Sequence, residues 1–255
     1  MRLDHVALAT RDAAAPLAAL VGDLGGTVLS GGLAIGYRPM QVHLGTAESG
    51  MKVELLEPWA TEDNDFLDRF LTRHGEGPHH LTFKVDDLET TLHAVRAAGY
   101  TPVGVDLSMP MWKEAFLQPR DAHGTVVQLA SSTSPHKSAL EEYEQVRDHG
   151  VGMGFGEVWW PEPPPRASDV TYLRRVVMVT PTLDDTRRFF VELLGGEQRE
   201  AGEGWVELTW PGGGHIRFEQ RDDHQPGIDR LELEGPGPAR EVIVAGTRLV
   251  VNAPS

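Results

Sequence analysis

The chain has 255 residues, of which 40% are hydrophobic and 24% are charged, an ordinary composition for a globular protein. Its formal net charge of −15 argues against nucleic acid or an anionic membrane as the main partner, because both require a basic surface. The absence of cysteine excludes disulfides, thiolate nucleophiles and Cys-type zinc sites.

No apolar run approaches the roughly 18 residues that span a membrane, so we expect no membrane partner. The first residues, MRLDHVALATRD, lack the basic and then apolar layout of a signal peptide. The expectation from both features is a cytoplasmic protein.

Three stretches of the chain share one pattern. They begin at Asp4 (DHVALATRDAAAPLAAL), His79 (HHLTFKVDDLETTLHAV) and Arg174 (RRVVMVTPTLDDTRRFF). Each reads as a short apolar strand, then an acidic or Thr/Pro turn, then a helix that ends at glycine. Asp12, Asp86 and Thr182 are expected near the helix starts, and Gly25, Gly99 and Gly195 at the helix ends.

Further strands follow each helix, so the repeated unit is βαβββ and roughly 50 residues long. The expected strands are 28–36, 40–45 and 51–57 in the first unit, 101–105, 114–118 and 125–130 in the second, and 205–210 and 215–220 in the third. A fourth, shortened copy is indicated by GIDRLELEG from Gly227 and GTRLVVNAP from Gly246. The prediction is an α+β fold in which paired βαβββ units form curved mixed sheets, duplicated as two domains.

The domain boundaries follow from the repeat. Residues 1–130 are expected to form a domain of two complete units, and residues 171–255 a degenerate and shortened second domain. The intervening residues 131–170 are rich in Gly and Pro and are predicted to be a linker.

Equivalent polar residues recur in the first two units. His5 and His80 lie in the first strands, while Glu54 and Gln128 lie in the last strands, at nearly equal spacings. Strand alternation places His80 and Thr82 on one face and His79 on the opposite, mostly apolar face. Two imidazoles, a carboxylate and an amide oxygen on one curved sheet are a plausible donor set for a divalent metal.

With these residues the chain resembles the vicinal oxygen chelate superfamily, which includes glyoxalase I, methylmalonyl-CoA epimerase and extradiol dioxygenases. The stretches LDHVALAT, MKVELLEP, GEGPHHLTFKVDDLE and EAFLQPRDAHGTVVQLA look most like the methylmalonyl-CoA epimerase branch. The resemblance implies one divalent ion (Zn, Ni, Co, Mn or Fe) held by one ligand from the first and last strand of each unit. Carried over, the ligands are His5, Glu54, His80 and Gln128.

Two departures from the epimerase branch concern the catalytic base. Gln128 stands where that branch has a carboxylate, and residues 24–47 contain no Asp or Glu where the second carboxylate is expected. An amide accepts no proton at neutral pH. Glu54 and His43 are therefore the predicted catalytic residues, whereas Glu114 and Asp121 are alternative bases that are more readily interpreted as surface acids.

The predicted function is isomerase or lyase chemistry on a small molecule that chelates the metal through neighbouring oxygens, such as an acyl thioester, a hydroxy acid or a dicarbonyl. One alternative is an Fe(II)-dependent ring-cleaving dioxygenase that uses His5, His80 and Glu54. Another is a small-molecule binding protein without catalysis. The resembled family often pairs units across chains, so either a homodimer or a monomer is expected.

The second half lacks this donor set. Arg175, Arg217 and Arg230 stand where His5, Glu54 and His80 stand in the first half. Guanidiniums do not ligate a divalent cation, and we expect them to pair with local acids such as Glu219, Asp229 or Glu232 rather than to bind an anion.

Overall fold

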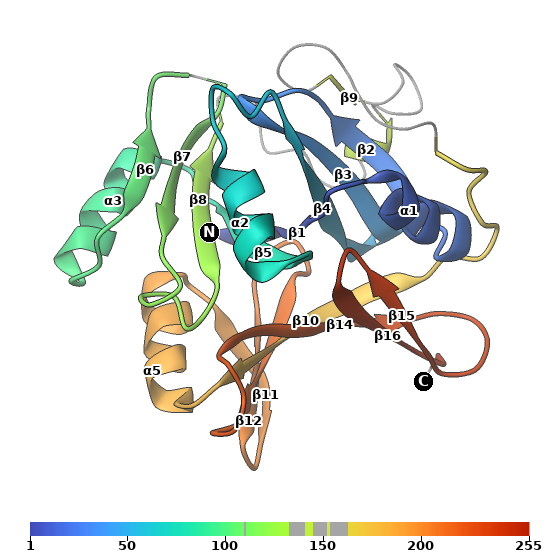
Figure 1. The fold of residues 1–255 in the computed structure, drawn as a ribbon. Helices are drawn as coiled ribbons and strands as arrows, with labels where there is room; N and C mark the ends of the chain where they lie inside the picture. The colour runs from blue at the N-terminus through green and yellow to red at the C-terminus, as the bar shows by residue number, and fades with distance from the viewer. Residues whose placement is uncertain (110, 133–140, 145–151, 154–162, 255) are drawn as a thin grey trace. The chain divides into compact units, whose positions relative to one another are not determined.

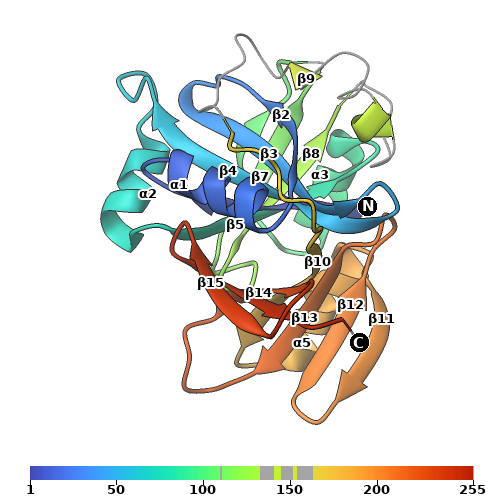
Figure 2. The same ribbon diagram turned by 90° about the vertical axis from the view of Figure 1, so that its right-hand side faces the viewer.

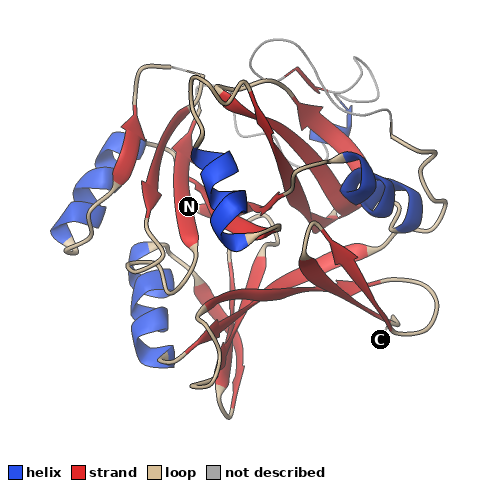
Figure 3. Cartoon of the chain, viewed as in Figure 1, coloured by secondary structure: helices blue, strands red, loops and turns tan. Residues whose placement is uncertain are grey.

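The computed structural model describes residues 1–109, 111–132, 141–144, 152–153 and 163–254. Strands dominate these residues (Figure 3) and belong to two mixed sheets, one of nine strands and one of seven. This confirms the α+β class that the repeat predicted. The chain packs into two compact units, which are Met1–His5, His80–His136 and Arg175–Arg230 for unit 1, and Val6–His79, Lys137–Arg174 and Leu231–Ser255 for unit 2.

Four strands have residues in both units: β1 (Arg2–Ala9), β5 (Gly77–Lys84), β10 (Tyr172–Thr180) and β14 (Gly227–Glu234). Each unit therefore combines chain from the first and second halves. The domain limits expected from the sequence, 1–130 and 171–255, remain a prediction.

Unit 1 contains the second and third copies of the repeat. Its further elements are α3 (Leu88–Ala97), β6 (Val103–Asp106), β7 (Lys113–Leu117), β8 (Val126–Ser131), α5 (Leu183–Arg187), the π-helical turn η2 (Arg188–Leu193), β11 (Glu197–Gly202), β12 (Trp205–Thr209) and β13 (His215–Gln220). The N-cap of helix α3 is Asp87, next to Asp86, and the Asp87 side chain accepts hydrogen bonds from the amides of Glu89 and Thr90.

Both copies in unit 1 have the same strand order, β5-β8-β7-β6 and β10-β13-β12-β11. The first and last strands of each copy pair in parallel, with Thr82 opposite Gln128 in one and Val177 opposite Arg217 in the other. Figure 1 shows β6, β7 and β8 side by side, with α3 next to them. The repeat predicted from sequence is thereby confirmed, although β11 was not expected.

Aromatic side chains from both copies form the core of unit 1. Phe83 of β5 lies with its ring centroid 5.2 Å from that of Trp210 and 6.4 Å from that of Phe190. Phe190 in turn lies 4.6 Å from Phe218. These rings are buried, so the two copies share one hydrophobic core.

Unit 2 contains most of the first copy and the shortened fourth copy. Its further elements are α1 (Ala14–Leu17), the π-helical turn η1 (Ala18–Asp23), β2 (Thr27–Gly31), β3 (Gly36–Thr46), β4 (Ser49–Trp59), α2 (Phe66–His74), β9 (Gly152–Met153), β15 (Arg240–Val244) and β16 (Thr247–Asn252). Neither α2 nor β15 was expected from the sequence.

Strands β2, β3 and β4 run side by side in unit 2 (Figure 2) and form antiparallel pairs. The β3–β4 register places Gln41 opposite Glu54 and His43 opposite Lys52, so these four side chains share one face. The opposite face is apolar, with Val42 and Val53 fully buried.

Candidate metal centre

His5 is the buried imidazole of β1, with 1% of its surface exposed. Its Nδ1 lies 2.8 Å from Asp4 Oδ2, and Lys84 Nζ lies 3.9 Å from the other oxygen of Asp4. A carboxylate bonded to one ring nitrogen fixes the tautomer and orientation of a metal-ligating histidine, leaving the other nitrogen for the metal. The Asp4 contact is therefore the one that a histidine ligating through Nε2 requires.

Thr82 links His5 to Gln128. The Thr82 hydroxyl lies 2.8 Å from His5 Nε2 and 2.6 Å from Gln128 Oε1, and both Thr82 and Gln128 are buried. When His5 Nδ1 carries the proton shared with Asp4, the Nε2 and Oε1 lone pairs both face one hydroxyl, whose single proton serves only one of them. Two buried lone pairs that face one small region are a suitable surrounding for a cation.

His80, the second predicted imidazole ligand, is also buried, with 5% exposed. Its ring centroid lies 5.8 Å from that of His5 and 6.4 Å from that of Phe116 on β7. Among the residues that the structure describes, ligand atoms of His5, Glu54 and His80 all lie within 4.8 Å of one another. Three of the four predicted ligands therefore form one group.

Glu54 lies on β4 with 8% of its surface exposed, and Gln41 Nε2 donates to its Oε1 at 3.1 Å. A buried carboxylate is costly unless it is hydrogen-bonded, paired or bound to a cation. The set of two imidazoles, this carboxylate and the Gln128 amide oxygen fits a divalent ion of the nitrogen- and oxygen-binding kind.

His43 shares the β3–β4 face with Glu54 but is not in the group of clustered ligand atoms. It is 3% exposed, and its Nδ1 lies 3.0 Å from the Tyr143 hydroxyl. Burial, with the nearby charges of Lys52 and Arg166, lowers the pKa of His43 to about 4. His43 is therefore neutral at pH 7.

His79 packs against aromatic side chains of α2. Its ring centroid lies 4.6 Å from that of Phe70 and 5.9 Å from that of Phe66. Burial lowers its pKa to about 4, which leaves a neutral ring suited to an aromatic environment. The packing contacts agree with the apolar face assigned to His79 from strand alternation.

Glu114 is not the surface acid that the sequence favoured. It is half-buried on β7, and its Oε2 accepts hydrogen bonds from Gln128 Nε2 and Trp112 Nε1, both at 2.8 Å. Sequence reasoning also missed Asp4 and Thr82 as partners of His5. The available signals were the adjacency of Asp4 to His5 and the strand alternation that puts Thr82 on the face of His80.

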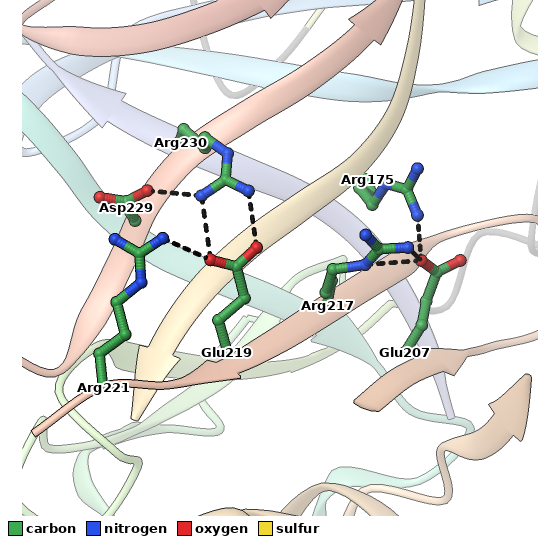
Figure 4. Close-up of polar contacts among 7 residues, drawn as sticks. All are labelled: Arg175, Glu207, Arg217, Glu219, Arg221, Asp229 and Arg230. Carbon is green, nitrogen blue, oxygen red and sulfur yellow. Dashed lines mark hydrogen bonds and ion pairs between the residues drawn. The ribbon is translucent and has the colours of Figure 1, made fainter. Parts of the chain in front are cut away.

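The arginines of the second half pair with acids, as expected (Figure 4). Arg175 and Arg217 both bond to Glu207, whose side chain is 1% exposed, and Arg230 bonds to Glu219 and Asp229. Burial alone would raise the pKa of Glu207, but the guanidiniums outweigh burial and lower it. Ion pairs thus stand here in place of a metal donor set.

In the described part of the chain, no helix is both long and apolar enough to cross a bilayer.

The Glyoxalase/Bleomycin resistance protein/Dioxygenase superfamily matches residues 4–116. A comparison with curated proteins found no match. Over the whole chain, the fold is similar to that of a hypothetical protein from Staphylococcus aureus, with 9% identity, a TM-score of 0.62 and coverage of 99% of this chain and 98% of that one.

Two solved structures are similar to about half of the chain. One is a hypothetical protein from Bacillus halodurans C-125, with 25% identity, a TM-score of 0.47 and coverage of 53% of this chain and 97% of that one. The other is a substituted Streptomyces coelicolor methylmalonyl-CoA epimerase in complex with 2-nitronate-propionyl-CoA, with 24% identity, a TM-score of 0.47 and coverage of 54% and 98%.

The family match begins at the residue before His5 and includes Glu54 and His80. It confirms the resemblance drawn from the sequence motifs, and the whole-chain likeness confirms the duplicated fold. The similarity to the glyoxalase, bleomycin resistance protein and dioxygenase superfamily extends over residues 4–116.

Proposed function

We propose that the protein is a divalent-metal-dependent isomerase or lyase. The proposed substrate is a small molecule with neighbouring oxygens, such as an acyl thioester, a hydroxy acid or a dicarbonyl. The observation that carries the proposal is the clustering of His5, Glu54 and His80 ligand atoms within 4.8 Å. A bound zinc, nickel, cobalt, manganese or iron ion would supply a Lewis acid that stabilises negative charge on a substrate oxygen.

The chain's own residues divide into holding and proton-transfer roles in this proposal. His5, His80, Glu54 and the Gln128 amide oxygen would hold the ion, with Glu54 released from it when acting as the base, and Gln128 transfers no proton at neutral pH. The Glu54 carboxylate, kept in place by Gln41, takes a proton from the carbon next to the substrate carbonyl and returns it in the product. The proton that is removed is returned in the product, so this reaction requires no oxidant or reductant.

His43 is the second proposed base. Its lowered pKa leaves the ring neutral at pH 7, so it can accept a proton. It lies two register positions from Glu54 along the shared β3–β4 face. A pKa of about 4 makes it a weak base, which favours Glu54 for the first proton transfer.

A second candidate is an Fe(II)-dependent ring-cleaving dioxygenase. Two histidines and one carboxylate with remaining open positions are the ligand set of many non-haem iron oxygenases, and His5, His80 and Glu54 match that set. Oxygen consumption with Fe(II) and catechol-like substrates distinguishes this activity from proton transfer.

Proton exchange in D₂O tests the first proposal. The protein, loaded in turn with each of the five metals, is incubated with acyl thioesters, hydroxy acids and dicarbonyls, and deuterium at the acidic carbon is followed by NMR. We expect exchange that depends on metal, that E54Q loses and that H43Q retains at least in part. Stoichiometric capture of these compounds with neither exchange nor oxygen uptake would instead identify a binding protein.

A further inference from the structure

Glu114 connects to the proposed metal centre through Gln128. The two residues lie on the adjacent antiparallel strands β7 and β8, where Phe116 stands opposite Gln128 and Glu114 opposite Ala130. The Glu114 carboxylate accepts from the Gln128 amide nitrogen at 2.8 Å and from the Trp112 ring nitrogen at 2.8 Å. Trp112 therefore holds the Glu114 carboxylate in place, and this carboxylate in turn orients the Gln128 amide.

This contact decides which end of the Gln128 amide faces His5. An ionised carboxylate only accepts hydrogen bonds, so Glu114 selects the amide nitrogen. The amide oxygen must then point the other way, where it lies 2.6 Å from the Thr82 hydroxyl, which in turn lies 2.8 Å from His5 Nε2. Rotating the amide by half a turn would place two oxygens together at Glu114 and the amide nitrogen beside the Thr82 hydroxyl.

The same contact accounts for an amide at position 128. A glutamate there would bring a second carboxylate within hydrogen-bond distance of Glu114 in a half-buried place, and like charges so close disfavour ionisation of both. With Gln128, the metal-facing atom is a neutral oxygen, and the negative charge stands one residue behind it.

We propose that Glu114 is a positioning residue that orients Gln128 so that its amide oxygen, rather than its nitrogen, faces the divalent cation. The inference rests on the proposed function, because it assigns Glu114 a role toward the ion of that site. In this proposal Asp4 and Glu114 have the same role. Asp4 bonds to Nδ1 of His5 and Glu114 bonds to the amide nitrogen of Gln128, so that His5 Nε2 and the Gln128 amide oxygen each direct a lone pair toward the ion site.

The main test compares two substitutions of nearly equal size. E114Q keeps an oxygen that accepts from both Gln128 and Trp112, whereas E114M keeps the volume and removes the acceptor. We expect E114M to weaken Co(II) binding about 10- to 100-fold in competition titrations and to change the visible Co(II) spectrum. E114Q should stay within a few-fold of the wild type. Equal affinities for E114M and the wild type would overturn the proposal, and so would equally weak binding by E114Q and E114M.

A charge exchange tests the pair without metal. Q128E should lower the thermal midpoint of the metal-free protein, because it opposes two carboxylates, and E114Q/Q128E should recover most of the loss. If E114Q/Q128E does not recover the lost stability, Glu114 and Gln128 do not form the contact on which the proposal rests. If the wild type binds none of the five metals, the proposed function fails, while the metal-free midpoints still decide whether Glu114 orients Gln128.

Discussion

Replacing Glu207 by glutamine tests the ion cluster of the second half. The Glu207 carboxylate is 1% exposed, bonds to Arg175, and lies 3.1 Å from Arg199 Nη1 and 3.0 Å from Arg217 Nη2. At about 3 Å and an effective dielectric constant of about 20, each attraction is about 5 kcal/mol. Desolvation offsets most of this sum, and removal of one partner from a buried ion pair typically costs about 3–5 kcal/mol. E207Q leaves three guanidiniums around a neutral group, so we expect the free energy of unfolding to fall by an amount in that range.

Urea unfolding at pH 7, followed by circular dichroism, measures this loss. E200Q is the matched control, since Glu200 stands opposite Glu207 on β11 and is exposed; its effect should stay within about 0.5 kcal/mol. The native pKa of Glu207 is lowered, so its contribution is present above the unfolded pKa and is lost as the pH falls through the native pKa. The wild type and E207Q should therefore converge in strong acid. A loss below about 1 kcal/mol at pH 7 would refute the reasoning.

Two further predictions concern histidines. In metal titrations, H80A should bind no metal, whereas H79A should still bind it. In urea unfolding, H79A should lower the free energy of unfolding by about 1–3 kcal/mol, because it removes packing against Phe70. The reverse pattern would contradict the face assignment. The native pKa of His43, about 4, lies below its ordinary 6.5, so unfolding takes up a proton between these values and stability falls as the pH drops from 6.5 toward 4. Between pH 7 and 5.5, the free energy of unfolding of the wild type, measured in urea, should fall by about 1 kcal/mol more than that of H43Q. If the two proteins show the same pH dependence, His43 is not buried as a neutral ring.

The repeat and its strands could be predicted from the sequence because alternation and glycine-terminated helices are local signals. The spacing that links His5 with Glu54 and His80 with Gln128 is equally local to each copy, and ligand atoms of His5, Glu54 and His80 lie within 4.8 Å of one another, while their role as metal ligands stays a prediction. Glycines could be placed in the same way: Gly99 and Gly195 have positive φ where helices end.

The remaining features depend on contacts distant in sequence. Glu114 reads as a surface acid until β7 and β8 pair and bring it to Gln128. Glu207 was not predicted as the partner of Arg175 and Arg217, because it lies on a strand whose register with β13 is not visible in its own residues. Helix α2 was missed for a different reason: only four of its nine residues are apolar, and only Leu67 and Leu71 are buried.

Metal content measures the central claim most directly. The protein is purified anaerobically without chelators, its metal is quantified, and the metal-free form is then titrated with zinc, nickel, cobalt, manganese and iron. We predict one ion per chain in the wild type and none in H5A or H80A, with both variants remaining folded by circular dichroism. Less than about 0.1 ion per chain in the wild type, with no binding of any of the five metals on titration, would contradict the account.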